Sequence, residues 1–310
     1  MKFGFQIPNF GTFAWSEDLI ALSQKAEELG YDSVWVADHI IVPTDIHAKY
    51  PYSRSGRFPI AADADFLEPL TVLTYVAGAT RRIRLGTTVL ILPYRNPLVN
   101  AKVVATLDAV SGGRVILGVG VGWMEDEFRI LGLEEDAYRE RGRITDEHIK
   151  IYRECWTNSA PVYHGDRYQL DGFRFLPTAT QQPSIPIWVG GHSKAALRRA
   201  AELGDGWHAV VPSLEEFQEA VVSIRERARA VGRRPDDVTM SVHAGLMLLD
   251  EPSERVRPKI FAGTPTEVRD QIRRFEDAGC EYFVFDQWGA DRAQLEATME
   301  RFANDVAAKY

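Results

Sequence analysis

Residues Arg114 to Glu127, RVILGVGVGWMEDE, contain the pattern that decides the fold of this chain. An apolar run, Val115 to Leu117, leads into glycines at positions 118, 120 and 122. Glycine has no Cβ atom, so its backbone can approach another group closely. A dinucleotide loop, G-x-G-x-x-G, needs a glycine where Trp123 stands and should follow the first strand. We interpret the stretch as a strand ending at a ligand site, or as a tight turn without ligand.

The composition of the whole chain limits the class of protein. The length of 310 residues suits a single α/β barrel over residues 1–310. A net charge of −8 disfavours a nucleic-acid partner. The two cysteines, Cys155 and Cys280, are too few for a disulfide framework, and we expect both to be buried. We find no signal-peptide pattern and no apolar run of membrane-spanning length, so we expect a cytoplasmic protein without membrane association.

Eight β-rich segments alternate with helical patterns along the chain. This alternation predicts a (β/α)8 TIM barrel rather than an open sheet. Long irregular segments at 40–66 and 157–183 predict insertions after the second and fourth strands, and both could border the active-site face. The predicted strands are 2–8, 33–37, 83–92, the opening stretch, 185–189, 206–211, 238–249 and 281–286.

The carboxyl ends of barrel strands hold the chemistry in this architecture. Asp38-His39 is the sharpest candidate, because histidine exchanges protons near neutral pH and a carboxylate can orient it. The alternative is a histidine satisfied by local hydrogen bonds. The residues at the predicted strand ends are Asn9, Asp38, His39, Thr88, Gly120, Val121, Gly122, Trp123, Gly190, Gly191, His192, Ser193, His208, His243, Asp286 and Gln287.

Two further groupings allow a functional and a structural interpretation. The run from Gly190 to Ser193 precedes a helical pattern and fits an anion site made of backbone N–H groups, or an ordinary turn in which Ser193 caps the helix. The four histidines at strand ends could bind a metal, but the first strand lacks the paired histidines of zinc hydrolases, so we predict no metal. Aromatic residues of the insertions could line a substrate mouth or pack locally: Tyr50, Tyr52, Phe58, Tyr163 and Tyr168.

Several longer motifs together resemble the bacterial luciferase-like monooxygenase superfamily, and most closely its F420-dependent oxidoreductase branch. They are KFGFQIPNFG, AEELGYDSVWVADH, RIRLGTTVLILPYRNP, TLDAVSGGRVILGVGVGWMEDEF and PIWVGGHSKAALRRAAELGDGWH, and they span most of the chain. The resemblance implies a (β/α)8 barrel, usually a homodimer, with a flavin or deazaflavin across the carboxyl-terminal mouth. Only eight of the 36 basic residues are lysine, which fits the GC-rich genomes of many F420 producers.

The resemblance also implies a role for each matching residue. Asp38 would contact the polar edge of the cofactor ring, and His39 would lie at its reactive face as the acid/base group. Thr88-Val89 would form a bulge behind the ring, with a non-prolyl cis peptide in F420-dependent relatives. Gly120, Val121 and Gly122 would lie along the ring and ribityl chain. Gly190, Gly191, His192 and Ser193 would hold the phosphate end.

Two departures from the pattern bear on the substrate. F420-dependent alcohol and sugar-phosphate dehydrogenases have a tryptophan where this chain has Val42-Pro43, and a proton-donating glutamate where it has Trp123. Glu125 or Glu127 could substitute for that glutamate. We expect an F420-dependent oxidoreductase that transfers a hydride between the deazaflavin and a small organic substrate. The alternatives are a monooxygenase supplied with reduced FMN by a separate flavin reductase, and a cofactor-binding protein without turnover.

Overall fold

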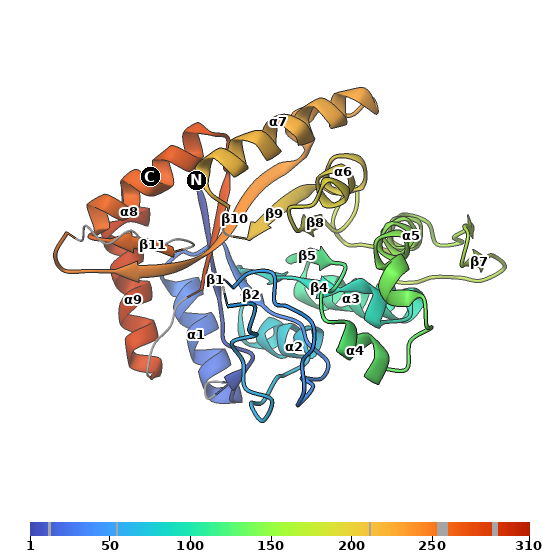
Figure 1. Ribbon diagram of the computed structural model, residues 1–310, viewed down its shortest axis with the longest axis horizontal. Coiled ribbons are helices and arrows are strands. Elements are labelled where there is room, and N and C mark those ends of the chain that lie inside the picture. Colours follow the sequence, from blue (N-terminus) through green and yellow to red (C-terminus); the bar gives the residue numbers. More distant parts are fainter. Residues whose placement is uncertain (12–13, 54, 211, 253–259, 287–290) are drawn as a thin grey trace.

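Eight parallel strands pair in a closed ring at the centre of the molecule (Figure 1). The computed structural model describes all residues except 12–13, 54, 211, 253–259 and 287–290. Pairing of the first strand with the last closes the ring, with Phe3 opposite Phe283. In ring order the strands are β1 (Lys2–Gln6), β2 (Ser33–Val36), β3 (Arg84–Thr87), β5 (Val115–Gly120), β8 (Ile187–Gly190), β9 (Gly206–Val210), β10 (Thr239–Leu248) and β12 (Tyr282–Asp286).

Helices surround this ring and connect its strands (Figure 1). Local sequence explains where several of them begin. Asn96 accepts from the N–H groups of Leu98 and Val99 ahead of a proline, and Ser213 and Thr264 form capping boxes. The helices are α1 (Ser16–Glu28), α2 (Pro69–Ala79), α3 (Pro97–Ser111), α4 (Glu125–Ile130), α5 (Ala137–Thr157), α6 (Lys194–Leu203), α7 (Leu214–Ala230), α8 (Pro265–Asp277) and α9 (Arg292–Asp305). Short 3₁₀ turns lie at η2 (Leu92–Tyr94), η3 (Pro235–Asp237) and η4 (Ala307–Lys309).

Strand residues alternate between the inside of the barrel and the helices, so buried side chains lie on both faces of the strands. Outward residues such as Phe5 and Leu85 belong to the large cluster shared with the helices. A separate buried cluster contains Trp35, Ile116, Trp188, Tyr282 and Val284. Side chains of this size fill a closed barrel, so it is a packed core and its chemistry is confined to the ends.

The predicted (β/α)8 barrel is confirmed, with differences in detail. The third strand is not continuous over residues 83–92, because β3 ends at Thr87 and β4 (Leu90–Ile91) starts after a cis Thr88–Val89 peptide bond. Three short elements and a helix went unpredicted because they span too few residues to show a period: β6 (Tyr163–His164), β7 (Gln169–Leu170), β11 (Ile260–Gly263) and α4. The predicted end of the sixth strand, Val211, lies outside the described residues.

The second insertion, residues 157–183, follows α5 and does not border the mouth as a lid would. Its hairpin, β6–β7, packs beside α5, where the Tyr168 hydroxyl lies 3.3 Å from His148 Nε2. Its later residues return to the start of β5, where Gln181 donates to the carbonyl of Val115. Tyr163 and Tyr168 therefore pack locally and do not line a substrate mouth.

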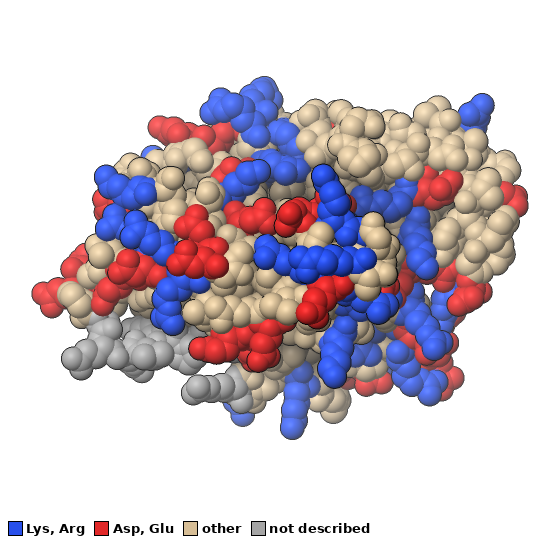
Figure 2. Space-filling model, turned by 90° about the horizontal axis from the view of Figure 1, so that it is seen from above, with Lys and Arg blue, Asp and Glu red and all other residues tan. Residues whose placement is uncertain are grey.

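Both cysteines are buried and free, as expected from the sequence. No helix in the described ranges is long and apolar enough to cross a membrane. Figure 2, seen from above, shows Lys and Arg side chains intermixed with Asp and Glu on the described part of that face.

The alternating glycines of β5 are explained first by the neighbouring strand. A Cβ atom on Gly118 would lie 1.9 Å from the carbonyl oxygen of Thr87, and one on Gly120 would lie 2.5 Å from a methyl group of Val89. Gly122 has a φ of +82°, and a Cβ there would meet Phe128 at 2.8 Å. Gly118 and Gly120 thus allow β5 to approach the third strand, and Gly122 leaves room for Phe128.

We predict that Gly118→Ala lowers the free energy of unfolding by more than about 2 kcal/mol, because a backbone oxygen cannot move aside cheaply. Gly78→Ala is the matched control. Gly78 lies in α2 with open space around its Cβ position, so alanine should raise stability by about 0.5–1 kcal/mol. Urea unfolding of both variants tests this, and equal midpoints would contradict the packing argument.

Candidate active site

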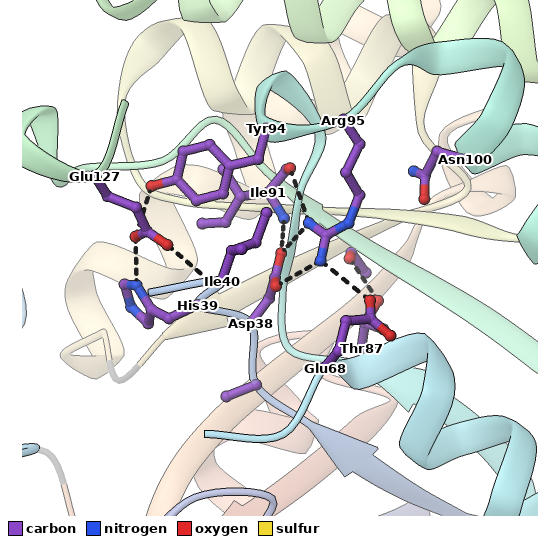
Figure 3. A network of polar contacts seen from close by, with 12 residues as sticks. Asp38, His39, Ile40, Glu68, Thr87, Ile91, Tyr94, Arg95, Asn100 and Glu127 are labelled. Atoms are coloured by element: carbon purple, nitrogen blue, oxygen red, sulfur yellow. Dashed lines mark hydrogen bonds and ion pairs between the residues drawn. The ribbon is translucent and has the colours of Figure 1, made fainter. Parts of the chain in front are cut away.

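His39 is anchored at the carboxyl end of the barrel by a buried carboxylate from a distant part of the chain. It follows the end of β2, and its Nδ1 lies 2.7 Å from Oε2 of Glu127 in α4 (Figure 3). The Glu127 side chain is 0% exposed and that of His39 is 9% exposed. A carboxylate accepts hydrogen bonds, so this contact places a proton on Nδ1 of His39. The second ring nitrogen, Nε2, is left as the one that can exchange a proton with a substrate.

Glu127 also binds the turn after β4 and the segment that follows β2. The hydroxyl of Tyr94 donates to Oε2 at 2.9 Å, and the N–H of Ile40 donates to Oε1 at 2.8 Å. Asp126 binds the first insertion further along the sequence, where its carboxylate accepts from the N–H groups of His47 and Ala48 at 2.9 and 3.3 Å. Burial alone would raise the pKa of Asp126, but the hydrogen bonds from His47 and Ala48 leave it lowered. The two carboxylates therefore hold the first insertion against α4.

Asp38 points the other way, toward the half-buried Arg95 (Figure 3). Its carboxylate accepts from Arg95 at 2.7 and 2.9 Å and from the N–H of Ile91 at 2.8 Å. Burial alone would lower the pKa of Arg95, but Asp38 and Glu68 raise it, so the guanidinium is charged. This bidentate ion pair fixes β4 against the end of β2. A contact between Asp38 and a cofactor remains a prediction.

The Thr88–Val89 bulge lies between β3 and β4 and has the cis peptide bond that the resemblance implies. The Val89 side chain projects over two glycines of neighbouring strands. A Cβ atom on Gly120 would come within 2.5 Å of it, and one on Gly190 within 3.0 Å. The glycines at 120 and 190 thus provide the space for Val89. Three predicted site segments meet here: 88–89, 120–122 and 190–193.

Thr88 contacts two histidines inside the mouth. Its Oγ1 lies 3.0 Å from Nε2 of His208 and 3.3 Å from Nδ1 of His243. The imidazole rings of His208 and His243 stack with centroids 5.8 Å apart. Burial lowers the pKa of each histidine; His243 lowers that of His208 further, and Asp286 partly offsets the effect of burial at His243, so the neutral form of each ring is favoured.

The segment from Gly190 to Ser193 is a structured turn at the start of α6. Trp207 Nε1 donates to the carbonyl of Gly191 at 2.8 Å, and His192 Nε2 lies 2.8 Å from the carbonyl of Val210. Ser193 caps the helix by accepting from the N–H of Ala196, so its own hydroxyl hydrogen can still donate to an anion. The structural and the functional interpretation of Ser193 are therefore compatible.

An aromatic cluster covers His39. Phe58 and Phe66 lie 4.9 and 5.4 Å from its ring, centroid to centroid, and Trp123 lies 6.1 Å away. Tyr50 extends the cluster by contacting both Phe58 and Trp123. The aromatic residues of the first insertion thus gather at the mouth.

The loop 120–123, which includes Val121, is held from α5. Arg141 donates to the carbonyl of Gly122 at 3.1 Å, and the Tyr138 hydroxyl donates to the carbonyl of Trp123 at 3.1 Å. These contacts fix the backbone beside the aromatic cluster. The orientation of Trp123 is therefore set from two sides, by α5 and by the first insertion.

Other predicted strand-end residues have different roles. Asn9 is fully buried and joins strand ends, donating to the carbonyls of Ala37 and Leu67 at 2.8 Å each. Two of the four histidines, His208 and His243, meet at Thr88, but within the described ranges no group of three or more His, Cys, Asp and Glu side chains could hold a metal. Gln287 lies outside the described residues.

The site contains partners that the sequence alone did not assign. Tyr94 ends the 3₁₀ turn η2 after β4 and Arg95 follows it, but no local pattern pairs them with Glu127 and Asp38. Glu127 was one of two candidate substitutes for the missing glutamate, and the other, Glu125, is exposed. A useful signal was available in the acidic cluster after the glycine strand, because three carboxylates at a predicted strand end indicate a site.

A cavity of about 530 Å³ lies at the opposite end of the barrel. It is lined by residues that begin strands, including Lys2, Arg84, Thr239 and Tyr282. Barrel chemistry is located at carboxyl ends, and the buried dyad of His39 and Glu127 is at that end. We therefore take the mouth with His39 as the candidate active site.

Comparison with known proteins agrees with this geometry. The model of the luciferase-like monooxygenase family matches residues 1–259, and the chain belongs to this family. The crystal structure of a monooxygenase from Streptomyces bottropensis covers 100% of both chains with a TM-score of 0.78 and 25% identity.

Relatives within the family differ in cofactor. An uncharacterised protein of Mycobacterium tuberculosis is 33% identical over 69% of this chain and 72% of its own. An F420-dependent glucose-6-phosphate dehydrogenase of Amycolatopsis mediterranei is 28% identical over 94% of both chains. An FMNH2-dependent dimethylsulfone monooxygenase of Pseudomonas putida is 30% identical over 60% of this chain and 50% of its own. The family therefore includes enzymes that use either cofactor.

The N–H of Ile41 also donates to Glu127 Oε1, at 3.3 Å. We predict that Glu127→Gln raises hydrogen–deuterium exchange at the N–H groups of Ile40 and Ile41 by about tenfold, because a hydrogen bond to a charged group contributes about 1.5 kcal/mol or more. Asp126→Asn is the matched control and should raise exchange at His47 and Ala48 instead. Unchanged exchange at Ile40 in the Glu127 variant would show that the carboxylate does not hold the insertion.

Proposed function

We propose that this protein is an F420-dependent oxidoreductase that acts on a small organic substrate. The observation that supports this best is the buried dyad of His39 and Glu127 beside the Thr88–Val89 bulge at the barrel mouth. The dyad provides one oriented proton-transfer group in an apolar surrounding. The full-length similarity to an F420-dependent relative favours the same cofactor class.

The residues present fit a phosphate-bearing flavin-type cofactor. The start of α6, with the Ser193 hydroxyl and the helix N-terminus, suits the phosphate end. Gly120, Val121, Gly122 and the bulge Thr88-Val89 would face the ring, and Gly190, Gly191 and His192 would border the phosphate. When bound, the deazaflavin supplies hydride chemistry.

The residues of the chain would supply the proton and the surroundings. His39 would transfer a proton at Nε2 while Glu127 holds Nδ1, so that a hydride and a proton together reduce a carbonyl or an activated double bond. Asp38 would act through Arg95 to hold the bulge, in addition to any contact with the ring. The aromatic cluster of Tyr50, Phe58 and Trp123 would exclude water from His39.

A second candidate is an FMN-dependent monooxygenase that receives reduced FMN from a separate flavin reductase. It is favoured by the 30% identity to the FMNH2-dependent relative. Both candidates would bind a tricyclic ring of similar shape at the same mouth. The buried free thiols of Cys155 and Cys280 fit a reducing cytoplasmic location for either.

Titration of the purified protein with F420 and, separately, with FMN distinguishes the two, with tryptophan quenching and ligand fluorescence as readouts. We expect a dissociation constant for F420 in the micromolar range or below, and much weaker binding of FMN. Tight binding of FMN alone would overturn the F420 proposal in favour of the monooxygenase. Binding of neither would overturn both.

With the cofactor identified, His39→Ala should lower kcat by about 10²–10⁴-fold and leave cofactor affinity nearly unchanged, because it removes proton transfer and not the phosphate site. His164→Ala is the matched control, since His164 is exposed on the β6–β7 hairpin and should retain full activity. Equal activity of the two variants would exclude His39 as the proton-transfer group.

We also propose a homodimer that forms through α2 and α3. Apolar residues are exposed along these neighbouring helices: Tyr75 is 51% exposed, Val99 is 64% and Val110 is 64%. Val103, at 40%, completes a stripe on α3. Packing against a second copy would remove this apolar surface from water.

Val99→Glu combined with Val103→Glu should convert the dimer to a monomer, because charges would be buried at the interface. The matched control is Val222→Glu on α7, which is 55% exposed outside this face and should leave the dimer intact. Light scattering during size-exclusion chromatography measures the mass. A wild-type monomer, or a dimer that survives the double substitution, would refute this interface.

A further inference from the structure

A partly buried hydrogen-bond chain crosses the mouth at the Thr88–Val89 bulge, and the acid/base role of His39 does not use it. Ser241 Oγ lies 2.6 Å from Nδ1 of His208, and Nε2 of His208 lies 3.0 Å from Oγ1 of Thr88. Thr88 in turn lies 3.3 Å from Nδ1 of His243. The chain links β10, β9 and the end of β3 and then returns to β10.

The last atom of this hydrogen-bond chain, Nε2 of His243, is buried and has no hydrogen-bond partner within the described part of the molecule. The Asp286 carboxylate faces it at 3.8 Å, which is too long for a hydrogen bond. A buried polar atom without a partner is uncommon in folded proteins and calls for a physical explanation. Asp286 is the last residue of β12 and Thr88 follows β3, so this atom lies at the carboxyl end of the barrel.

The Asp286 carboxylate decides which ring nitrogens carry protons in this hydrogen-bond chain. Asp286 favours a proton on the nearer nitrogen of His243, which is Nε2. Nδ1 of His243 is then an acceptor, so Thr88 donates its hydroxyl proton to it. Thr88 therefore accepts from Nε2 of His208, and Nδ1 of His208 accepts from Ser241. Both neutral histidines have the same tautomer, with the proton on Nε2.

We propose that His243 is a ligand-binding residue of this site, whose Nε2–H donates a hydrogen bond to a carbonyl oxygen of a molecule bound in the mouth. The chain Ser241–His208–Thr88 acts on His243 by holding its ring and its tautomer. This role rests on the proposed function only for the identity of the ligand. Such a carbonyl is present on a flavin-type ring and on an enone substrate, so the experiment must separate these sources.

The first test uses the wild-type protein labelled with ¹⁵N-histidine. Long-range ¹H–¹⁵N spectra of the free protein should show His208 and His243 protonated on Nε2. Adding F420, and then cyclohex-2-en-1-one, should shift the Nε2 signal of His243. A shift on the first addition identifies the cofactor ring as the acceptor, and a shift only on the second identifies the substrate. If Nε2 of His243 is unprotonated in the free protein, or if its signal shifts with neither probe, the proposed ligand-binding role of His243 is overturned.

The second test compares two amide substitutions. In His243→Asn the amide reaches the position of Nδ1, so the contact with Thr88 is kept and the Nε2 donor is lost. In His243→Gln the amide reaches the position of Nε2, so a donor is kept. We expect the Asn variant to bind the responding probe about tenfold more weakly, and the Gln variant to recover most of that affinity. Equal affinities of both variants and wild type, or equal losses in both variants, would overturn the assignment.

The two proposals fail in different ways. If F420 and FMN both fail to bind the wild-type protein, the proposed function is wrong. The tautomers in the free protein and the response to cyclohex-2-en-1-one still decide the role of His243. If F420 binds and His243 does not respond to either probe, the proposed function stands and His243 is a packing residue.

Discussion

The buried carboxylate of Glu127 is the contact on which the site depends. A charge with no access to water is tolerated only where several donors satisfy it, and here they are His39, Tyr94 and the backbone N–H of Ile40. These donors come from the end of β2 and the turn after β4. One carboxylate thus fixes the histidine tautomer, the start of the first insertion and the position of α4. The orientation of His39 and the closure of the insertion are consequences of the same requirement.

A second constraint, steric rather than electrostatic, shapes the remainder of the mouth. The third strand bulges inward at Thr88-Val89, and the neighbouring strands accommodate it only because Gly118, Gly120 and Gly190 have no side chains. The bulge in turn places the Thr88 hydroxyl between two stacked histidines. Glycines that resemble a ligand loop therefore have a structural function first, and the ligand surface results from it.

The two constraints meet at the Asp38–Arg95 ion pair. Asp38 neighbours His39 in the sequence, and Arg95 follows the strand that continues the bulge. The pair therefore joins the part of the mouth that Glu127 holds to the part that the Thr88–Val89 bulge shapes. A barrel with a packed interior can change its chemistry by altering this rim, and the two cofactor classes among its relatives agree with that view.

The sequence by itself determined the barrel, the positions of His39 after the second strand and of Ser193 at the start of a helix, and the burial of both cysteines. These follow from apolar periodicity, helix caps and turn residues, which act over roughly ten residues. Only the tertiary structure decided the partners: His39 and Glu127 are 88 positions apart, and Thr88 and His243 are 155 apart. Closure of the ring brings such residues together, and a local pattern contains no information about which strand end will face another. The break in the third strand and the return of the second insertion along α5 were missed for the same reason, because contacts between distant segments override local preference.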